Sequence, residues 1–573
     1  MYSSPERTPV DYVNPYIGNI SHLLVPTYPT VHLPNSMLRV YPERENFTGN
    51  TINGLPLIVT SHRGSSAFNL SPYQGELQKA GSIIQYGYDN EVIKPYYYSV
   101  DLDDDGMYVQ YAPSHQSGIY QIDFSQTDKP AYLIFNTRDG ELKTDGKSIS
   151  GYQKLGNHTQ VYIYLETDQQ PLKIGTHQGA VIRTTDKSTQ GHNAYYILEY
   201  PKGTASVLLR YGVSFISSEQ AKQNLRREIK NYNLQAVADK GRSVWNETLG
   251  KIFVKGGTEN EKTVFYTSLY RTYERMICIS EDSRYFSAYD GQVHDDEGIP
   301  FYVDDWIWDT YRATHPLRLI IETEMESNMV NSLIRMAYQM QPNWMPTFPE
   351  INGDSRRMNC NHGVATVLDA YNKGMRSFDL AKAYQVCKAA ITEKTLAPWS
   401  SKPAGVLDQF YKDHGYFPAL AVGEQETVPE VHSWERRQPA AVTLGTVYDE
   451  WCLGNIAQAL GDKKEADYFL KRSLNYHKIF NKETCFFHPK DSFGNFIQPF
   501  DYRYSSGVGG RDAYDENNGW VYRWDLPHNV ADLVNMMGGK ERFVEELERM
   551  YSTPLGKGRP DFHHQFGDHT GNV

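Results

Sequence analysis

The segment VTLGTVYDEWCLGNIAQALG, residues 442–461, decides the fold class of the second half of the chain. It has a helical pattern that ends at Gly461, and a second helical pattern follows over 463–480. A glycine just past the end of a helix supplies the left-handed backbone conformation that terminates it. Two helices joined by so short a turn predict an αα-hairpin.

The same helix–glycine–helix pattern recurs over residues 250–573 and predicts αα-hairpins stacked side by side in a ring. Rings of this kind enclose a pocket at one end, where the loops between hairpins carry the functional residues. A solenoid is the alternative, but the loops are long and irregular and no fixed repeat period is present. The last twelve residues, 562–573, have no helical pattern, so we expect the chain to stop before the fold does. The other helical segments are 261–277, 322–340, 362–373, 379–391, 530–537 and 541–551.

Short β-branched and aromatic runs occupy residues 90–215 and predict an antiparallel β-sandwich. Turn residues such as Asp139-Gly140 separate the runs, and many short strands without helices between them are typical of a sandwich. A strongly polar helical pattern then follows and reads as a linker between two bodies. We therefore expect a β-sandwich domain over 10–216, a helical linker over 217–249 and a truncated catalytic helical domain over 250–573.

Composition excludes several classes of protein. The 573 residues carry a net charge of −12, which argues against a surface built to neutralise nucleic-acid phosphates or anionic lipids. No run of 18 apolar residues is present, so we expect no transmembrane helix. The N-terminal residues 1–7 have no apolar stretch, so we expect no signal peptide in this chain and infer either a cytoplasmic protein or one whose leader has been removed. Five cysteines in so long a chain cannot form a disulfide framework, and we expect all five to be free.

Aromatic residues make up 13% of the chain, which suits the binding of sugar rings but is equally typical of large cores. The densest cluster is YVDDWIWDTYR, residues 302–312, where carboxylates alternate with indoles. Indoles stack on the C–H faces of a pyranose, and carboxylates bind pairs of hydroxyls. The alternative is that Trp306 belongs to the core and Asp309 caps a helix. We find no zinc motif of the His-Glu-x-x-His type and no phosphate-binding glycine loop.

Two further clusters carry candidate site residues. In YDENNGWVYRW, residues 514–524, Glu516 lies between aromatic and amide side chains that would desolvate it and raise its pKa, as a general acid requires. The alternative is an exposed acidic loop before a helix. In MNCNH, residues 358–362, the alternatives are a pocket loop and an asparagine cap with a buried cysteine.

Several of these motifs, taken in order, resemble glycoside hydrolase family 92, the calcium-dependent exo-α-mannosidases. The Trp-Asp-Thr-Tyr-Arg segment of 308–312, followed by His315-Pro316, resembles the Trp-Asp-Thr-Phe-Arg-x-x-His-Pro motif of that family. Together the matching segments extend over nearly the whole chain. The others are 14–18 near the start, 97–102 in the sandwich, Tyr-Asp-Glu-Trp at 448–451 and 514–524 with Pro527-His528.

The resemblance implies a β-sandwich joined through helices to an (α/α)6-type barrel. It implies an exo-acting, inverting α-mannosidase that trims terminal mannose from glycans outside the cytoplasm, in the periplasm or as a secreted enzyme. Glu516 falls on the position of the catalytic acid, and the two carboxyl groups of an inverting enzyme stand ~6.5–9.5 Å apart. A bound Ca²⁺ is expected to contact the sugar hydroxyls, with ligands not identified in this chain. The expected substrate-binding residues are Trp308, Asp309, Asn359, Cys360, Asn518 and Trp520.

The sequence also departs from the family pattern. Family members continue into an Asn-Glu-Pro-Ser segment linked to calcium and an Asp-Cys-Gly segment that bears the base, and neither occurs in these 573 residues. We therefore expect a C-terminally incomplete chain in which Glu516 lacks its base and which is nearly inactive. Residues 26–34 replace a Gly-Asn-Thr-Phe-Pro-Gly-Ala motif, and Gly445 stands where a glutamate is usual.

Three alternatives to a standard α-mannosidase stay open. One is a carbohydrate-binding relative without catalysis, and another is a glycosidase with altered sugar or aglycone specificity. A phosphorylase on the same two-domain plan would need basic residues around the pocket. The nearest candidates are Arg356, Arg357, Arg436 and Arg437.

Overall fold

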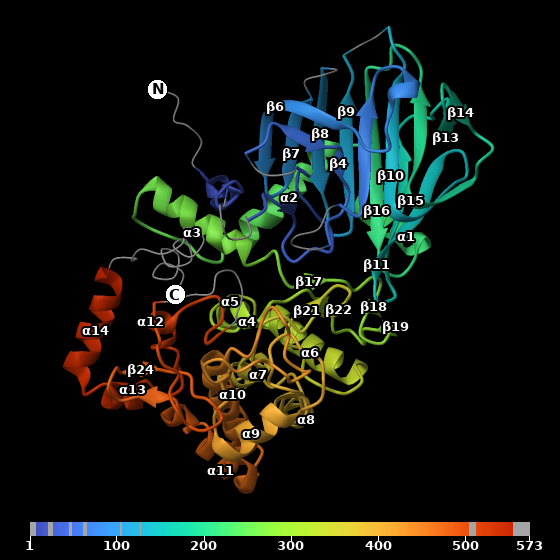
Figure 1. Cartoon of the computed structure of the whole chain (residues 1–573). Helices are drawn as coiled ribbons and strands as arrows, with labels where there is room; N and C mark the ends of the chain where they lie inside the picture. Colours follow the sequence, from blue (N-terminus) through green and yellow to red (C-terminus); the bar gives the residue numbers. More distant parts are fainter. Residues whose placement is uncertain are drawn as a thin grey trace. The chain divides into compact units, whose positions relative to one another are not determined.

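The computed structural model describes residues 7–20, 27–44, 48–60, 66–102, 106–125, 128–503 and 512–553 (Figure 1). The chain divides into two compact units, Met1–Asp304 and Asp305–Val573. Residues 1–6 and 562–573, on which the predictions about the leader and the chain end rest, lie outside the described residues. No helix in the described part is both long and apolar enough to cross a membrane.

The first unit is built on a fourteen-stranded, entirely antiparallel sheet. Twelve of its strands follow one path in the order β14-β13-β15-β10-β11-β12-β16-β9-β8-β7-β6-β3. Off this path, β5 pairs with β10 and β4 pairs with β5. The predicted antiparallel β-sandwich is confirmed. The strands are β3 (Thr51–Asn53), β4 (Leu55–Pro56), β5 (Phe68–Tyr73), β6 (Gln85–Lys94), β7 (Tyr97–Leu102), β8 (Met107–Pro113), β9 (Ser117–Asp123), β10 (Ala131–Thr144), β11 (Ser148–Gly156), β12 (Thr159–Thr167), β13 (Lys173–Gln178), β14 (Val181–Arg183), β15 (Ser188–Tyr200) and β16 (Ser206–Ser214).

Strand β10 changes partners halfway along its length. Along one edge of β10, residues 132–137 pair with β5 and residues 140–144 pair with β11. Along the other edge, β15 pairs with nearly the whole length of β10. Gly140 lies where the change occurs, and a Cβ atom there would stand 1.8 Å from the carbonyl oxygen of Tyr152. The glycine is therefore required by the close approach of the two backbones.

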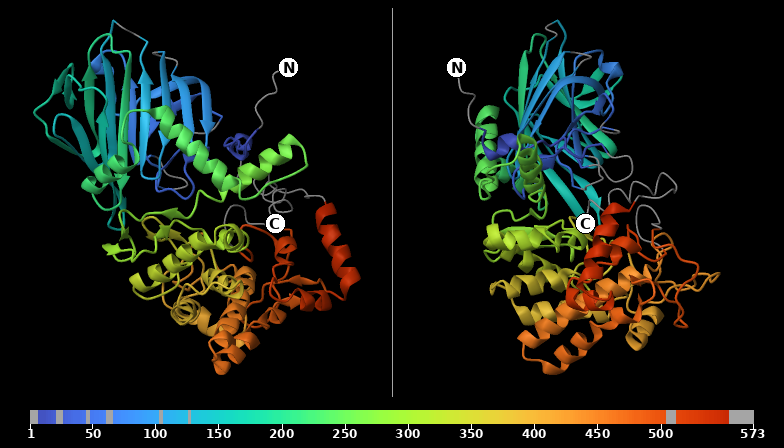
Figure 2. Two further views of the ribbon diagram at one scale, coloured as in Figure 1. Left: turned by 180° about the vertical axis from the view of Figure 1, so that it is seen from behind. Right: turned by 90° about the vertical axis from the view of Figure 1, so that its left-hand side faces the viewer.

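Helices of the first unit cover part of the sheet. The residues predicted as a linker form α1 (Ser218–Glu228) and α2 (Leu234–Leu249), each begun by a side chain that accepts a backbone N–H: Ser217 and Asn233. Helix α1 packs against β12 and β16, and α2 lies across β8 and β9, as the rear view shows (Figure 2). Helix α3 (Glu259–Arg271) follows. Domain boundaries at 216 and 249 stay a prediction.

The second unit is helical, as predicted, and its centre is α10 (Pro439–Ala459). This helix is buried on nearly all sides and packs against α7, α8 and α11. Helix α11 (Lys463–Arg472) follows Gly461, whose φ of 81° is the left-handed conformation expected of the hairpin turn. The remaining helices are α4 (Ile307–Thr310), α5 (Thr314–Ile321), α6 (Thr323–Gln339), α7 (Gly363–Asn372), α8 (Leu380–Thr392), α9 (Val406–His414), α12 (Gly519–Tyr522), α13 (Val530–Met536) and α14 (Lys540–Ser552).

Two predicted helices are too long. The helix predicted over 463–480 ends at Arg472, because the chain tightens into a 3-10 turn and then forms the strand Phe480–Asn481. The helix predicted over 261–277 ends at Arg271, because residues 277–278 pair with 302–303 as a short β-ribbon. In both cases the chain leaves the helix and forms a two-residue strand, which is too short for a periodicity to reveal.

Trp245 packs helix α2 against the rest of the first unit. It is fully buried, its Nε1–H donates to the carbonyl oxygen of His32 at 2.8 Å, and its ring contacts those of Tyr270 and Tyr273. Replacing a buried tryptophan by alanine removes about 3–5 kcal/mol of stability. We expect Trp245→Ala to lower the free energy of unfolding by that amount, measured by denaturant titration with circular dichroism.

The matched control is Phe253→Ala in the same unit, because Phe253 is 82% exposed. Its free energy of unfolding should stay within about 0.5 kcal/mol of the wild type. Equal effects of the two substitutions would contradict the role assigned to Trp245.

Candidate active site

Four segments that are far apart in the sequence meet in the second unit, each at or just before the start of a helix. They are residues 306–309 at α4, 358–362 before α7, 435–438 before α10 and 514–518 before α12. Three of them contain the clusters singled out from the sequence. The fourth, 435–438, carried only two arginines considered for phosphate binding.

The side-chain amide of Asn359 joins all four segments. Its Oδ1 accepts a hydrogen bond from the indole Nε1–H of Trp308 at 3.2 Å. Its Nδ2 donates to Gln438 Oε1 at 2.7 Å and to Asp515 Oδ2 at 3.0 Å. Asn359 is 6% exposed, so these bonds replace those that water would make. The amide therefore fixes Trp308 relative to the turn that carries Glu516.

The loops of this network have unusual backbone conformations. Non-glycine residues with positive φ are uncommon, and where they cluster they point to a functional site. Both the 358–360 and the 436–438 segments contain two such residues. The left-handed residues are Met358, Cys360, Arg436, Gln438 and Glu516.

The predicted catalytic acid, Glu516, is half-buried between the fully buried Asp515 and the half-buried Asn517. Asn518 is 3% exposed and caps α12, since its Oδ1 accepts the N–H groups of Trp520 and Val521 at 2.9 and 3.3 Å. The cap fixes the end of the turn in which Glu516 lies.

Only some of the predicted binding residues lie in one hydrogen-bond network. Trp308 and Asn359 belong directly to the hydrogen-bond network, and Asp309 is exposed on α4. Trp520 has other partners, because its ring packs edge-on against Phe486 at 5.5 Å and lies 5.7 Å from the guanidinium of Arg549.

Cys360 fills a space that Gly445 leaves open. The thiol is 5% exposed, and burial, with the charge of Asp449 adding to it, raises its pKa well above the usual value. A Cβ atom at residue 445 would stand 2.1 Å from its Sγ. The departure from the family pattern at Gly445 is thus matched by a side chain from another loop. All five cysteines are free, as predicted.

Sequence reasoning missed the carboxylate that holds the 358–362 loop. Asp449 of α10 is fully buried and accepts from the backbone N–H of Asn361 at 2.7 Å and from Nδ1 of His362 at 2.7 Å. The His362 ring in turn lies 4.2 Å from that of Tyr311. The signal was present in the Tyr-Asp-Glu-Trp motif, but nothing in the sequence says which loop its aspartate holds.

A second buried group of charges anchors the start of α5. His315 Nε2 lies 2.8 Å from Asp305 Oδ2, and its Nδ1 lies 2.7 Å from Glu326 Oε1 of α6. All three side chains are at most 1% exposed. Burial alone would lower the pKa of the imidazole, but the charges of Glu326 and Asp305 outweigh it and raise that pKa to about 10. His315 is therefore an imidazolium held between two carboxylates.

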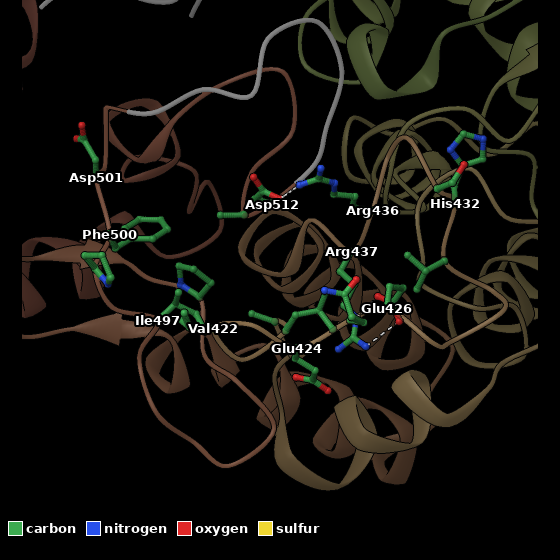
Figure 3. Close-up of a pocket in the computed structure, with 18 residues that line it drawn as sticks. Val422, Glu424, Glu426, His432, Arg436, Arg437, Ile497, Phe500, Asp501 and Asp512 are labelled. Carbon is green, nitrogen blue, oxygen red and sulfur yellow. Dashed lines mark hydrogen bonds and ion pairs between the residues drawn. The ribbon is translucent and has the colours of Figure 1, made fainter. Parts of the chain in front are cut away.

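A cavity of about 710 Å³ opens beside the 435–438 segment (Figure 3). Its walls come from residues 419–437, 489–501 and 512–513. Within the described residues, no three histidine, cysteine, aspartate or glutamate side chains are grouped so that they could hold a metal ion.

The four arginines considered for phosphate binding all have carboxylate partners. Arg356 pairs with Asp354 at 3.3 Å and Arg357 with Glu350 at 3.5 Å. The other pairs are Arg437 with Glu426 at 2.6 Å and Arg436 with Asp512. Because all four guanidinium groups are paired with carboxylates, they give no support to the phosphorylase alternative.

Comparison with known proteins gives consistent matches over the chain. The glycosyl hydrolase family 92 N-terminal domain matches residues 12–214, and the glycosyl hydrolase family 92 catalytic domain matches residues 220–571. These matches extend almost to the end of the chain, so the expected C-terminal incompleteness is not supported. A curated relative, an uncharacterized secreted glycosidase of Arthroderma benhamiae, is 22% identical over 95% of this chain and 74% of its own length.

Solved structures of the same family share the fold. A family 92 inverting mannosidase of Bacteroides thetaiotaomicron superposes with a TM-score of 0.84 at 25% identity, covering 99% of this chain and 78% of that one. A family 92 α-mannosidase of the same organism, in complex with mannoimidazole, gives 0.82 at 22% identity, covering 96% and 75%.

We expect His315→Gln to lower the free energy of unfolding by about 3–5 kcal/mol, because it leaves two buried carboxylates without their cation. The raised pKa of His315 determines how its contribution to the free energy of unfolding depends on pH. The contribution of His315 is complete below pH about 6.5, the ordinary histidine pKa, and is lost as the pH rises towards about 10. Denaturant titrations between pH 6 and 10 should show the difference from wild type shrinking.

The control for this prediction is His477→Gln, which removes an exposed histidine 2.7 Å from Asp532. An exposed pair contributes about 0–1 kcal/mol. A difference between wild type and His315→Gln that does not change with pH would contradict the charged state assigned to His315.

Gly445→Ala should destabilise the protein by about 1–3 kcal/mol through overpacking against Cys360. In the interior of a helix the same change ordinarily stabilises by about 1 kcal/mol. In a Cys360→Gly background the clash is absent, so Gly445→Ala should become neutral or stabilising. A double-mutant cycle of unfolding free energies measures this coupling, and additive effects would refute the contact.

Proposed function

The chain belongs to glycoside hydrolase family 92, and from this premise we propose that it is an exo-acting, inverting α-mannosidase that removes terminal mannose from glycans. The family model for the catalytic domain and the 25% identity to an inverting mannosidase support the reaction type. The observation that carries the site is the Asn359 amide, which joins the indole of Trp308 to the turn bearing Glu516.

Glu516 is proposed as the general acid that protonates the leaving oxygen. Its side chain is half-buried, so the carboxyl is partly shielded from water while remaining accessible to a substrate. In an inverting reaction a carboxylate on the opposite face of the sugar activates water, with the two carboxyl groups ~6.5–9.5 Å apart.

The other predicted residues are proposed to bind and orient the terminal mannose. The Trp308 ring is only half-buried, so a face remains available to the sugar, while Asn359 fixes its orientation. The exposed carboxylate of Asp309 is suited to a pair of sugar hydroxyls. Cys360 and Asn518 are proposed to act mainly by shaping the two loops, and Trp520 by packing at the start of α12.

Calcium dependence is implied by the family alone. The described residues contain no group of three histidine, cysteine, aspartate or glutamate side chains that could hold the ion, and Ca²⁺ also takes carbonyl oxygens and water as ligands. We also propose that the protein works outside the cytoplasm, because the curated relative is named as a secreted glycosidase.

Glu516→Gln tests the proposal through the leaving group. Loss of general-acid help costs about 10²–10⁴-fold, and a mannoside with a poor leaving group needs that help most. We expect kcat on α-mannobiose to fall by this factor and kcat on an activated aryl α-mannoside to fall much less. Steady-state kinetics on both substrates make the measurement, with the exposed Glu483→Gln as the control that should change neither.

Each other outcome has a definite meaning. Equal losses on the two substrates would assign Glu516 a positioning role. Unchanged rates would make it an ordinary acidic loop residue. A wild-type protein that binds mannosides but hydrolyses none would favour the non-catalytic alternative.

A further inference from the structure

Lys394 is a buried lysine whose ammonium group has no hydrogen-bond acceptor. It lies just after α8, where it pairs with Pro403 in an isolated β-bridge, and it is 5% exposed. Within the described part of the second unit, no carbonyl or carboxylate oxygen accepts a hydrogen bond from its Nζ. Burial removes the water that would otherwise solvate this charge, so an unpaired ammonium group here is costly.

The charges around Lys394 do not compensate it. Burial and the positive charge of Arg356 lower the pKa of Lys394 to about 8, although the charges of Asp354, Cys360 and Asp408 act in the opposite direction. Both carboxylates are already used by the backbone. Asp354 accepts three backbone N–H groups at 2.9–3.1 Å, and Asp408 accepts two at 2.6 and 2.7 Å. Each carboxylate therefore fixes its own loop, and the ammonium group is left without an acceptor.

Arg356 is a second buried cation whose N–H groups are incompletely used. It is 8% exposed, and its Nη1 lies 3.3 Å from Asp354 Oδ2 as an ion pair. Among the residues that the structure describes, this Nη1 has no hydrogen-bond partner. Its Nη2 points to the Sδ of Met340 at 3.8 Å, and a thioether sulfur is a weak acceptor. The guanidinium therefore retains N–H groups that can bind an additional acceptor.

Two neutral donors beside Arg356 also lack acceptors. The indole Nε1–H of Trp344 and the hydroxyl of Thr347 are buried and make no hydrogen bond within the described ranges. The ring of Trp344 lies 5.2 Å from the guanidinium of Arg356. The backbone N–H of Thr347 donates to the same Asp354 oxygen that Arg356 approaches. Native proteins leave few buried polar groups unsatisfied, so four such donors near one another point to a ligand that accepts hydrogen bonds.

The donor set defines the chemistry of that ligand. Two of the four donors are cationic and the indole can only donate, so a negatively charged acceptor satisfies them best. A small monovalent anion has no fixed bonding directions and can accept from all four types of group. A sulfate or phosphate dianion would be repelled by Asp354 and Asp408. A water molecule could accept some of these bonds, but it would not compensate the charge of the ammonium group.

We propose that a small monovalent inorganic anion, with the size and charge of chloride, binds between Lys394 and Arg356. The site lies beside the loop of residues 354–360, because Lys394 is near both Arg356 at its start and Cys360 at its end. The bound anion holds this loop and with it Asn359, the residue that joins the segments of the candidate active site. The proposal does not depend on the reaction that the protein catalyses.

The test removes the ammonium group and keeps a side chain of similar length. Lys394→Met is compared with the wild type and with Lys382→Met, a matched control at an exposed lysine of α8. Thermal unfolding of each full-length protein is measured in sodium chloride and in sodium gluconate at equal ionic strength. Gluconate is the control anion, because it is too large for a buried site between two side chains.

We expect chloride to raise the Tm of the wild type and of Lys382→Met by about 2 °C or more relative to gluconate, since a ligand that binds only the folded state stabilises it. The Tm of Lys394→Met should be the same in both salts. In gluconate, Lys394→Met should unfold at the same temperature as the wild type or higher, because it has lost a buried charge without a counter-ion.

A crystal of the wild type grown in sodium bromide tests the position of the anion directly. We expect an anomalous scattering peak in contact with Lys394 Nζ, and no such peak in Lys394→Met. An equal effect of chloride on the wild type and on Lys394→Met would overturn the proposal, as would a stronger stabilisation of the wild type by sulfate than by chloride. The absence of a bromide peak at Lys394 in the wild type would also overturn it and would assign the space to water.

Discussion

One buried amide organises the candidate site. Asn359 has one acceptor and two donor hydrogens in its side chain, and all three are used on segments 51, 79 and 156 residues away. An aspartate at this position would have no donor for Asp515, and a leucine would leave the indole N–H of Trp308 without an acceptor. The geometry of the site therefore depends on the chemistry of a single side chain, and through it on the left-handed residues that turn the loops inward.

Helix α10 gives that network a rigid base. Most of its residues are buried, and two of the polar ones, Thr443 and Asp449, accept hydrogen bonds from loop residues. The carboxylate of Asp449 accepts hydrogen bonds from the backbone N–H of Asn361 and from the imidazole of His362. Thr443 Oγ1 accepts the backbone N–H of Phe417 at 2.9 Å. A completely apolar helix would pack as well but would leave these loops without a fixed position. Buried polar groups on this helix thus specify the loops above its start rather than adding to the core.

The fold could be predicted from the sequence because its signals are local. Turn residues between short strands and glycines after helices act within a few residues. The predicted turn at Asp139-Gly140 is wrong, because both residues lie inside strand β10, where the glycine allows a close approach of two backbones. The candidate site could be predicted only in part. Trp308 and Glu516 stand in motifs that resemble known ones. The hydrogen bonds that hold their loops, from Asn359 to Gln438 and Asp515 and from the 361–362 segment to Asp449, act across long separations that no periodicity records. The cavity beside the 435–438 segment had no signal beyond Arg436 and Arg437, because its walls come from three separate stretches of the chain.

The contact between Gly445 and Cys360 constrains how this chain can change over evolutionary time. A side chain cannot return at residue 445 while the thiol occupies the space, since the first carbon would already overlap the sulfur. The loop residue must therefore become smaller before the helix residue becomes larger. The two positions are therefore coupled, and the cost of any substitution at 445 depends on which side chain stands at 360. A glutamate at 445 would need both a smaller residue at 360 and room for its carboxylate beside the buried 358–362 loop.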